Sequence, residues 1–175
     1  MTDSRQGRFR LWPRRQKRAT APATIAPPTA QGLAEKLSEL VQFERGVVAL
    51  YYYLHDEALA TLARSLCQSH QMANRLEQGV DRDLCAKEAS LESWRAVGAI
   101  WHSDAWQPGE ILPTFGFRII EALRGQPELW SVVVDPRAQF FGLAAAKDDQ
   151  HRYWLSLVIG QKGQEMGGDA ATAAR

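Results

Sequence analysis

The spacing of apolar residues changes from helical to two-residue along the chain, and this change most constrains the fold. A helix that starts at Asp56 and ends at Gly79 is predicted, because Asp56 can cap it and one face is apolar: Leu59, Leu62, Ala63, Leu66, Cys67, His70, Ala73. Apolar residues then alternate or run continuously over 139–146 and 152–159, with the polar residues 147–150 between them. This pattern is typical of a β-hairpin. The chain is therefore predicted to be an α/β protein that closes with a C-terminal hairpin.

The remaining elements follow from the same spacing and from stops at glycine and proline. We predict a helix over 33–45, a short amphipathic helix over 90–97, a loop over 101–113, a densely apolar buried helix over 115–123, and a β-branched segment over 130–134 that ends in a turn. The apolar run from Val47 to Leu54 leaves two alternatives open. It either continues the first helix or forms an apolar loop against the core.

The formal charge of the chain is divided between two parts of opposite sign. Residues 1–31 contain seven basic residues and one acidic residue, a net charge of +6. Residues 32–175 contain the other 14 basic residues and 19 acidic ones, a net charge of −5. We interpret residues 1–31 as a disordered basic arm rich in proline and alanine, residues 32–160 as one globular domain, and residues 161–175 as a disordered tail.

The basic arm also carries aromatic and apolar side chains, which have no core to enter if the arm is disordered. The segment around Trp12 therefore predicts binding to a polyanionic partner, through Arg8, Arg10, Trp12, Arg14 and Arg15. The expected partner is an acidic protein or an anionic surface, and nucleic acid is a weaker alternative. The remaining alternative is a solubilising arm that binds nothing.

Two tryptophans of the predicted loop are further candidates for binding. If Trp101 and Trp106 are exposed together, they form an apolar patch suited to a partner protein or an acyl chain, because large aromatic side chains dominate contact energies. The alternative for both residues is packing in the core.

Nothing in the sequence predicts export, membrane insertion or a cofactor. The residues after the basic start lack the apolar run of a signal peptide, and no window approaches the length of a membrane span. Cys67 and Cys85 are predicted to be two buried thiols, which would form one disulfide only if the protein were exported. We therefore expect a soluble, cytoplasmic protein without a metal or cofactor.

Several segments carry a resemblance to a known family. Residues 40–45 (LVQFER) resemble its opening LVNxxR helix, Asp56, Leu59 and Ala63 its D-x-x-L-x-x-x-A helix, residues 126–130 (QPELW) its S-P-G-H-R segment, and residues 141–144 and 153–154 its closing strands. The family is the CAP superfamily of cysteine-rich secretory, antigen-5 and PR-1-like domains, and the chain is similar above all to its short bacterial members. The resemblance covers Leu33 to Gly160 and implies an α-β-α three-layer sandwich.

The chain departs from the family at the polar residues of its central cleft. The resemblance implies a histidine shortly after the second helix, but none lies between His70 and His102. The glutamate of the family's GENI motif falls on Ala99, although Asp104 could substitute for it, and the histidine of S-P-G-H-R falls on Leu129. A cleft that binds a metal or polarises a substrate needs imidazole or carboxylate groups. The family's cleft chemistry is therefore predicted to be lost, which leaves a pseudo-active site.

These observations predict a non-catalytic binding or scaffolding module with a basic arm that recruits an acidic partner. The first alternative is a hydrolase with a remodelled cleft, which would use His102 with Asp104, or His55. His102, Ser103 and Asp104 include the residue types of a catalytic triad, but adjacent residues do not face one another as a triad requires. The second alternative is a small-molecule or lipid-binding protein.

Overall fold

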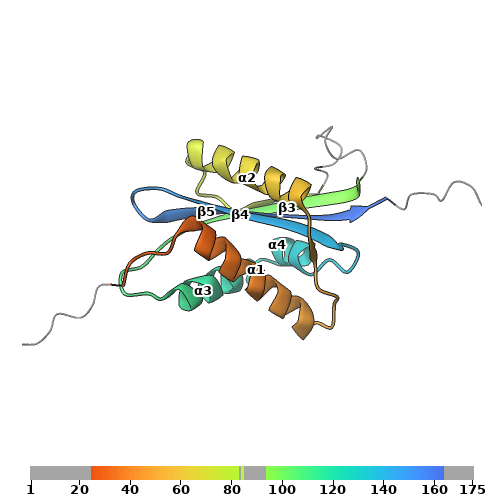
Figure 1. The fold of residues 1–175 in the computed structure, drawn as a ribbon, viewed down its shortest axis with the longest axis horizontal. Coiled ribbons are helices and arrows are strands. Elements are labelled where there is room, and N and C mark those ends of the chain that lie inside the picture. Colours follow the sequence, from red (N-terminus) through yellow and green to blue (C-terminus); the bar gives the residue numbers. More distant parts are fainter. Residues whose placement is uncertain (1–24, 83, 85–93, 164–175) are drawn as a thin grey trace, which may run out of the picture.

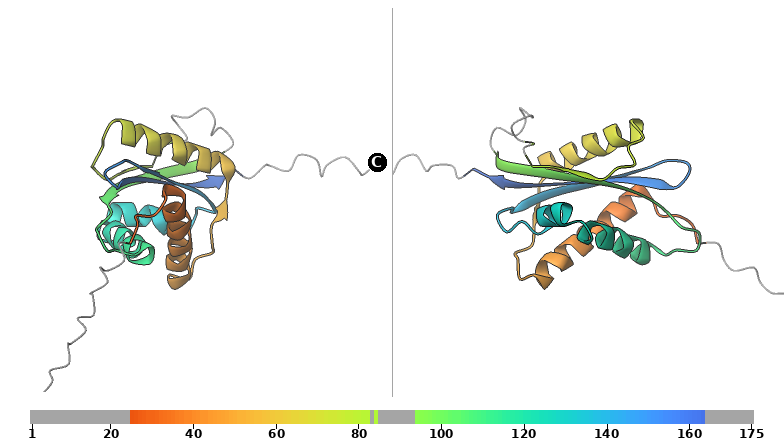
Figure 2. Two further views of the ribbon diagram at one scale, coloured as in Figure 1. Left: turned by 60° about the vertical axis from the view of Figure 1, so that its left-hand side comes forward. Right: turned by 180° about the vertical axis from the view of Figure 1, so that it is seen from behind.

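In the computed structural model, which describes residues 25–82, 84 and 94–163, a sheet lies between two layers of helices (Figure 1). The described elements are α1 (Ala30–Val47), β1 (Leu54–His55), α2 (Glu57–Met72), β2 (Gly79–Asp81), β3 (Trp94–Ala105), α3 (Leu112–Arg124), α4 (Pro127–Val133), β4 (Phe140–Lys147) and β5 (Arg152–Lys162). Helix α2 covers one face of the sheet, and α1, α3 and α4 cover the other (Figure 2). The predicted α-β-α sandwich is confirmed.

The five strands form one sheet in the order β1-β4-β5-β3-β2. Strand β1 is parallel to β4, and the other neighbouring pairs are antiparallel. The predicted C-terminal hairpin is confirmed as β4 and β5, which place β5 at the centre of the sheet. Residues 153–160 of β5 are all buried, because helices cover both faces of this strand. A strand covered on both faces needs a continuous apolar run, which is the pattern seen in its sequence.

Polar side chains cap the first two helices. The Asp56 carboxylate accepts hydrogen bonds from the backbone N–H groups of Ala58 (3.0 Å) and Leu59 (3.2 Å), so the predicted start of α2 is confirmed. Helix α1 begins earlier than predicted, because the Thr29 hydroxyl accepts a bond from the Gly32 N–H (3.0 Å). The Tyr153 hydroxyl donates to the Pro28 carbonyl (2.6 Å). The folded domain therefore includes residues that the sequence assigned to the arm.

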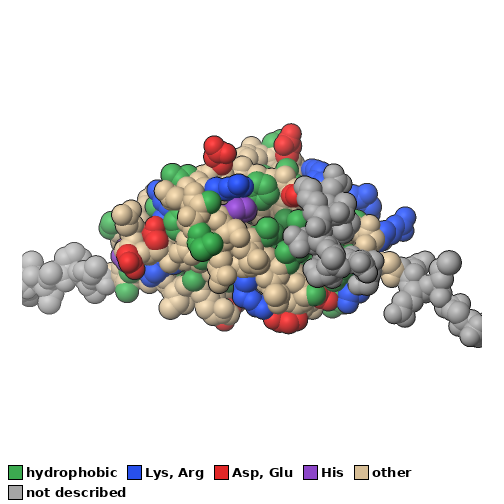
Figure 3. All heavy atoms as spheres, turned by 90° about the horizontal axis from the view of Figure 1, so that it is seen from above, with side chains coloured by type: hydrophobic (Ala, Val, Ile, Leu, Met, Phe, Trp, Pro, Cys, Tyr) green, Lys and Arg blue, Asp and Glu red, His purple; other side chains and the backbone are tan. Residues whose placement is uncertain are grey.

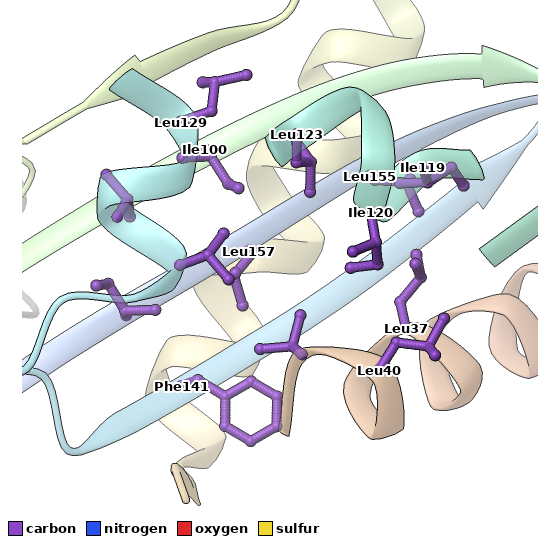
Figure 4. Close-up of a cluster of buried hydrophobic side chains, with 14 of the residues drawn as sticks. Leu37, Leu40, Ile100, Ile119, Ile120, Leu123, Leu129, Phe141, Leu155 and Leu157 are labelled. Carbon is purple, nitrogen blue, oxygen red and sulfur yellow. The ribbon is translucent and has the colours of Figure 1, made fainter. Parts of the chain in front are cut away.

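The core has one part on each side of the sheet. The larger part lies between the sheet and α1, α3 and α4, where aliphatic side chains from three helices and three strands point toward one another (Figure 4). The smaller part lies under α2 and includes Leu59, Ala63 and Cys67 of that helix. No described helix is long and apolar enough to cross a membrane.

Several elements differ from the prediction. Helix α2 ends at Met72, before the predicted end at Gly79. Residues 94–105 form strand β3, where a helix ending at Val97 and a loop from Trp101 were expected. The β-branched residues near Trp130 belong to helix α4. Strand β5 continues to Lys162, which pairs with Trp94, so this part of the predicted tail is ordered. The predictions for residues 1–24, for residues 85–93 and for residues 164–175 lie outside the described residues.

Candidate functional site

A polar cluster at the end of β3 contains the first candidate groups. The Arg118 guanidinium of α3 lies between two carboxylates, with Nη1 2.5 Å from Asp104 Oδ2 and Nη2 3.0 Å from Glu110 Oε2. Arg118 Nε also donates to Glu110 Oε1 (3.1 Å), and Nη2 donates to the Ala105 carbonyl (2.9 Å). Both carboxylates are thus bound by one arginine, an arrangement that holds the cluster together and leaves neither group free as a base.

His102 lies beside this cluster but does not join it. The residue is 8% exposed, and its Nδ1 is 2.8 Å from Gln78 Oε1. Its Nε2 is 3.9 Å from Asp104 Oδ2, which is too long for a hydrogen bond, and it has no partner within the described structure. Ser103 points to the opposite face of the sheet, where its hydroxyl donates to the Leu76 carbonyl (3.0 Å). The three residues therefore do not form a triad.

The void next to His102 is apolar and small. Its volume is about 20 Å³, and aliphatic side chains of α1, α3 and the sheet form most of its walls. A volume of this size holds about one water molecule, and no substrate fits in it. The void is a packing defect of the larger core.

We expect Asp104 to stabilise the fold in a pH-dependent manner. Burial alone would raise its pKa, but hydrogen bonds from Arg118 and from the Ala105 N–H (2.8 Å) outweigh burial and hold the pKa below the ordinary aspartate value. The stabilisation is therefore complete above about pH 4 and is lost as the pH falls through the lowered pKa. Asp104→Asn should lower the free energy of unfolding by about 1 kcal/mol at neutral pH. Urea unfolding across the acid range should show this difference disappearing.

The control for this prediction is Glu57→Gln. Glu57 pairs with Arg64 at 2.6 Å, but both side chains are more than half exposed, so its removal should change stability little at any pH. A deficit of Asp104→Asn that persists unchanged at acid pH would contradict the ion-pair assignment.

The other histidines do not converge with His102. His55 lies on β1, and two strands separate β1 from β3, a spacing of about 14 Å. His70 lies in the last turn of α2 and is buried against the sheet, where its ring centroid lies 4.9 Å from that of Trp101, and burial lowers its pKa. His151 is exposed in the β4–β5 turn. The structure therefore does not bring together the residues of the predicted hydrolase site.

Trp101 and Trp106 are not exposed together, so they do not form the apolar patch considered from the sequence. Trp106 is buried in the larger core and meets the Phe115 ring edge-to-face at 5.3 Å. Trp101 packs against His70 on the opposite face of the sheet. The prediction that these two residues share a partner-binding patch is therefore wrong. For Trp106, the alternative prediction of packing in the core is correct. Arg8, Arg10, Trp12, Arg14 and Arg15 lie outside the described residues.

One cleft position inferred from the family resemblance needs correction. Ala99 packs under α2, whereas Leu129 packs in the larger core, so the two side chains lie on opposite faces of the sheet. On β3, Gly98 and Ile100 share the face of Leu129, and a Cβ at Gly98 would lie 3.7 Å from a methyl group of Val132. Gly98 and Ile100 therefore place no carboxylate or imidazole beside Leu129, and His102, the next residue on this face, lies at the small void.

A polar hollow of about 280 Å³ lies next to Gly98, but its charged side chains are engaged. Arg82 donates to the Glu128 carbonyl (3.1 Å) and the Ser131 hydroxyl (2.6 Å). Arg137 pairs with Asp135 at 2.8 Å. Among the described residues, no group of three or more histidine, cysteine, aspartate or glutamate side chains is placed to hold a metal ion. The hollow thus presents no built ligand site.

Cys67 is the buried thiol that the sequence predicted. It donates to the Trp154 carbonyl (2.9 Å), and burial raises its pKa to about 12. Such a thiol remains protonated and unreactive at neutral pH. Cys85 lies outside the described residues.

The surface that stands out is apolar and lies at the C-terminal end of α1. We call it the α1-end patch, and it consists of six exposed large side chains: Phe43, Val47, Val48, Tyr51, Tyr52 and Leu54. Tyr51 is 94% exposed and Tyr52 is 68% exposed. By contrast, charged side chains of both signs are scattered over the face that carries α2 (Figure 3). Exposed apolar patches are a common feature of interaction surfaces in soluble proteins.

The loop that presents the patch is held in place by residues of α1. The Gln42 side chain donates to the Tyr53 carbonyl (2.8 Å) and accepts from the Tyr53 N–H (2.9 Å). Arg45 Nε donates to the Tyr51 carbonyl (2.9 Å). A Cβ built on Gly46 would lie 3.6 Å from the Tyr52 ring, so this ring lies over the end of the helix. The tyrosines are thus held outward by a fixed backbone.

The patch and Arg118 were both missed by reasoning from the sequence. In the sequence, the patch is indicated by the apolar run from Val47 to Leu54. The sequence leaves open whether this run continues the first helix or forms a loop that packs against the core. This run is a loop, but only Tyr53 of it is buried. The signal for Arg118 is its charge within the densely apolar segment 115–123, because a charged side chain that is partly buried requires a partner.

Comparison with solved structures finds the same fold in two bacterial proteins. An outer surface protein of Borrelia burgdorferi matches with a TM-score of 0.60 and 14% identity, over 80% of this chain and 98% of that one. A cysteine-rich secretory protein of Staphylococcus aureus matches with a TM-score of 0.55 and 12% identity, over 78% of this chain but only 40% of that longer one. No model of a known family and no curated protein matches the sequence. At these identities the likeness shows the fold alone.

Proposed function

Because the chain has a CAP-like fold, we propose that it is a non-catalytic binding or scaffolding module whose basic arm recruits an acidic partner. The observation that carries the proposal is the apolar character of the positions around Leu129, where Gly98 and Ile100 face it. A residue that polarises a substrate or holds a metal needs an ionisable side chain at such a place. The proposed binding residues of the arm are Arg8, Arg10, Trp12, Arg14 and Arg15.

The surroundings of three further ionisable groups support the same proposal. Asp104 and Glu110 are both bound by Arg118, and His102 has only an apolar void of one water's volume beside it. A general base must reach the proton it abstracts, and none of these groups opens onto a cavity that holds a substrate. We propose the cytoplasm as the compartment.

Binding to a simple polyanion tests the recruitment by the arm. The full chain should bind poly-L-glutamate, and added salt should weaken the complex because charges on the arm drive it. A full-length variant with glutamine at Arg8, Arg10, Arg14 and Arg15 should bind on the order of tenfold more weakly or worse. Fluorescence anisotropy measures both affinities. Equal affinity of the two chains would overturn the role of the arm.

The structure determines how the arm should be altered. Deleting residues 1–31 would remove the Thr29 cap and the Pro28 carbonyl that Tyr153 binds, and so would damage α1 and its anchor to β5. Substitution of the arginines avoids this. The matched control is Arg64→Gln on α2, which removes one exposed charge of the domain and should leave the affinity unchanged.

A further inference from the structure

We propose that the α1-end patch docks onto an anionic lipid bilayer while the basic arm binds the lipid headgroups. The inference rests on the proposed function, because it names the acidic partner of the arm. Tyrosine prefers the boundary between water and the acyl chains, where its ring is buried and its hydroxyl remains hydrated. Tyr51 and Tyr52 present two such rings, and Phe43, Val47 and Val48 surround them with apolar surface.

The charges around the patch suit an anionic surface. The segment 43–55 contains a single carboxylate, Glu44, which is buried and bound by Arg124 at 2.5 Å. The neighbouring Glu39 of α1 pairs with Lys36 at 2.7 Å. The surface of segment 43–55 therefore presents no carboxylate that would repel anionic headgroups. The neighbouring carboxylate of Glu39 is paired with Lys36.

A bilayer accounts for the arm and the patch together, which an acidic protein does not. An acidic surface can neutralise the arginines of the arm but offers little to six exposed apolar side chains. A bilayer supplies anionic headgroups for the arm and an apolar interior for the patch, and stable attachment of peripheral proteins generally needs two such signals. The fixed backbone around Tyr51 adds to this, because little ordering is needed when the patch docks.

The arm is long enough to reach the same membrane as the patch. It joins α1 at the end opposite the patch, and an α-helix of 18 residues is about 27 Å long. Trp12 is separated from Ile25 by a chain segment that can span up to about 43 Å. The arm and the patch can thus contact one surface at the same time.

The test measures binding of the full chain to vesicles by co-sedimentation. The vesicles consist of phosphatidylcholine alone or of phosphatidylcholine mixed with phosphatidylserine. The chain should bind the mixed vesicles more tightly, and salt should weaken this binding. The double variant Tyr51→Ser/Tyr52→Ser should bind on the order of tenfold more weakly, because it removes most of the inserted aromatic surface. The arm variant Arg14→Gln/Arg15→Gln should lose about fivefold for each charge removed.

Met72→Ser is the matched control for the patch. Met72 is 85% exposed at the end of α2, outside the patch, so its replacement removes exposed apolar surface without touching the proposed contact. It should bind vesicles as the unaltered chain does. Urea unfolding of each variant confirms that the fold is retained, as expected for side chains this exposed.

The outcomes separate this inference from the proposed function. If the tyrosine variant binds mixed vesicles as well as the unaltered chain while the arm variant does not, the arm recruits its partner alone and the patch proposal fails. If the chain binds poly-L-glutamate but not the vesicles, the partner is an acidic protein and the bilayer is overturned. If sedimentation velocity shows a dimer that the tyrosine variant abolishes, a second copy occupies the patch, and docking onto lipid is overturned as well.

Discussion

Replacing Gly142 with alanine should lower the free energy of unfolding by about 3 kcal/mol or more. Gly142 lies on β4 directly under α2, and a Cβ at this position would lie 2.1 Å from the Ala60 nitrogen and 2.2 Å from the Leu59 carbonyl carbon. These are backbone atoms of a helix, which cannot rotate away as a side chain can. The helix must therefore move off the sheet, and the smaller core under it loses its packing. Urea denaturation of both proteins measures the difference.

Gly98→Ala is the matched control in the same sheet. A Cβ at Gly98 would lie 3.6 Å from the Asp81 carbonyl oxygen, 3.7 Å from Val132 and 3.9 Å from Ile159, which are ordinary contact distances. This substitution should change stability by no more than about 0.5 kcal/mol, since it also restricts the unfolded chain. Similar losses for the two variants would mean that α2 does not pack as closely on β4 as the structure has it.

The elements that could be predicted are those in which local pattern and tertiary packing agree. Helix α2 has its cap at Asp56 and one buried face, and the hairpin of β4 and β5 has a polar turn between two apolar runs. The fold class and the resemblance of 141–144 to a closing strand followed from these signals. Such consistency between local and global preferences is what makes a segment predictable.

Strand β3 was mistaken for a helix followed by a loop because its buried residues imitate a helical period. Trp94, Val97 and Ile100 are three residues apart and all buried, as on one face of a helix. A register shift between Trp94 and Ala96 breaks the alternation that a strand should show. Only pairing with β5 along its whole length reveals the strand, and this partner is distant in sequence.

Helix α4 shows the opposite conflict. Val132, Val133 and Val134 favour a strand by their branched side chains, but Pro127 starts a helix and the first two valines are buried. Burial in tertiary structure outweighs a preference that amounts to a fraction of a kcal/mol per residue. The candidate site was harder to predict for a similar reason, because nothing local distinguishes the exposed Tyr52 from the buried Tyr53.

Replacing Arg45 with methionine should cost about 3–5 kcal/mol of stability, although no carboxylate pairs with its guanidinium in the described structure. Arg45 is 2% exposed and donates to backbone carbonyls of three segments: Tyr51 (2.9 Å), Asp135 (3.0 Å), Ala138 (3.3 Å) and Val133 (3.4 Å). Methionine fills the space but removes the donor from the Tyr51 and Ala138 carbonyls. The Val133 carbonyl keeps the Tyr53 hydroxyl as a donor, and the Asp135 carbonyl keeps the Ala138 N–H. Urea denaturation measures the loss.

Arg45→Lys and Arg64→Met separate the possible causes. Lysine keeps the charge but cannot spread its donors over three segments, so Arg45→Lys should lose a substantial part of the same stability. Arg64→Met removes an exposed arginine and should change stability little. If Arg45→Lys is as stable as the unaltered protein, the charge alone matters. If it is not, the donors of one side chain join the end of α1, the end of α4 and the loop that presents Tyr51, and the position of the α1-end patch depends on them.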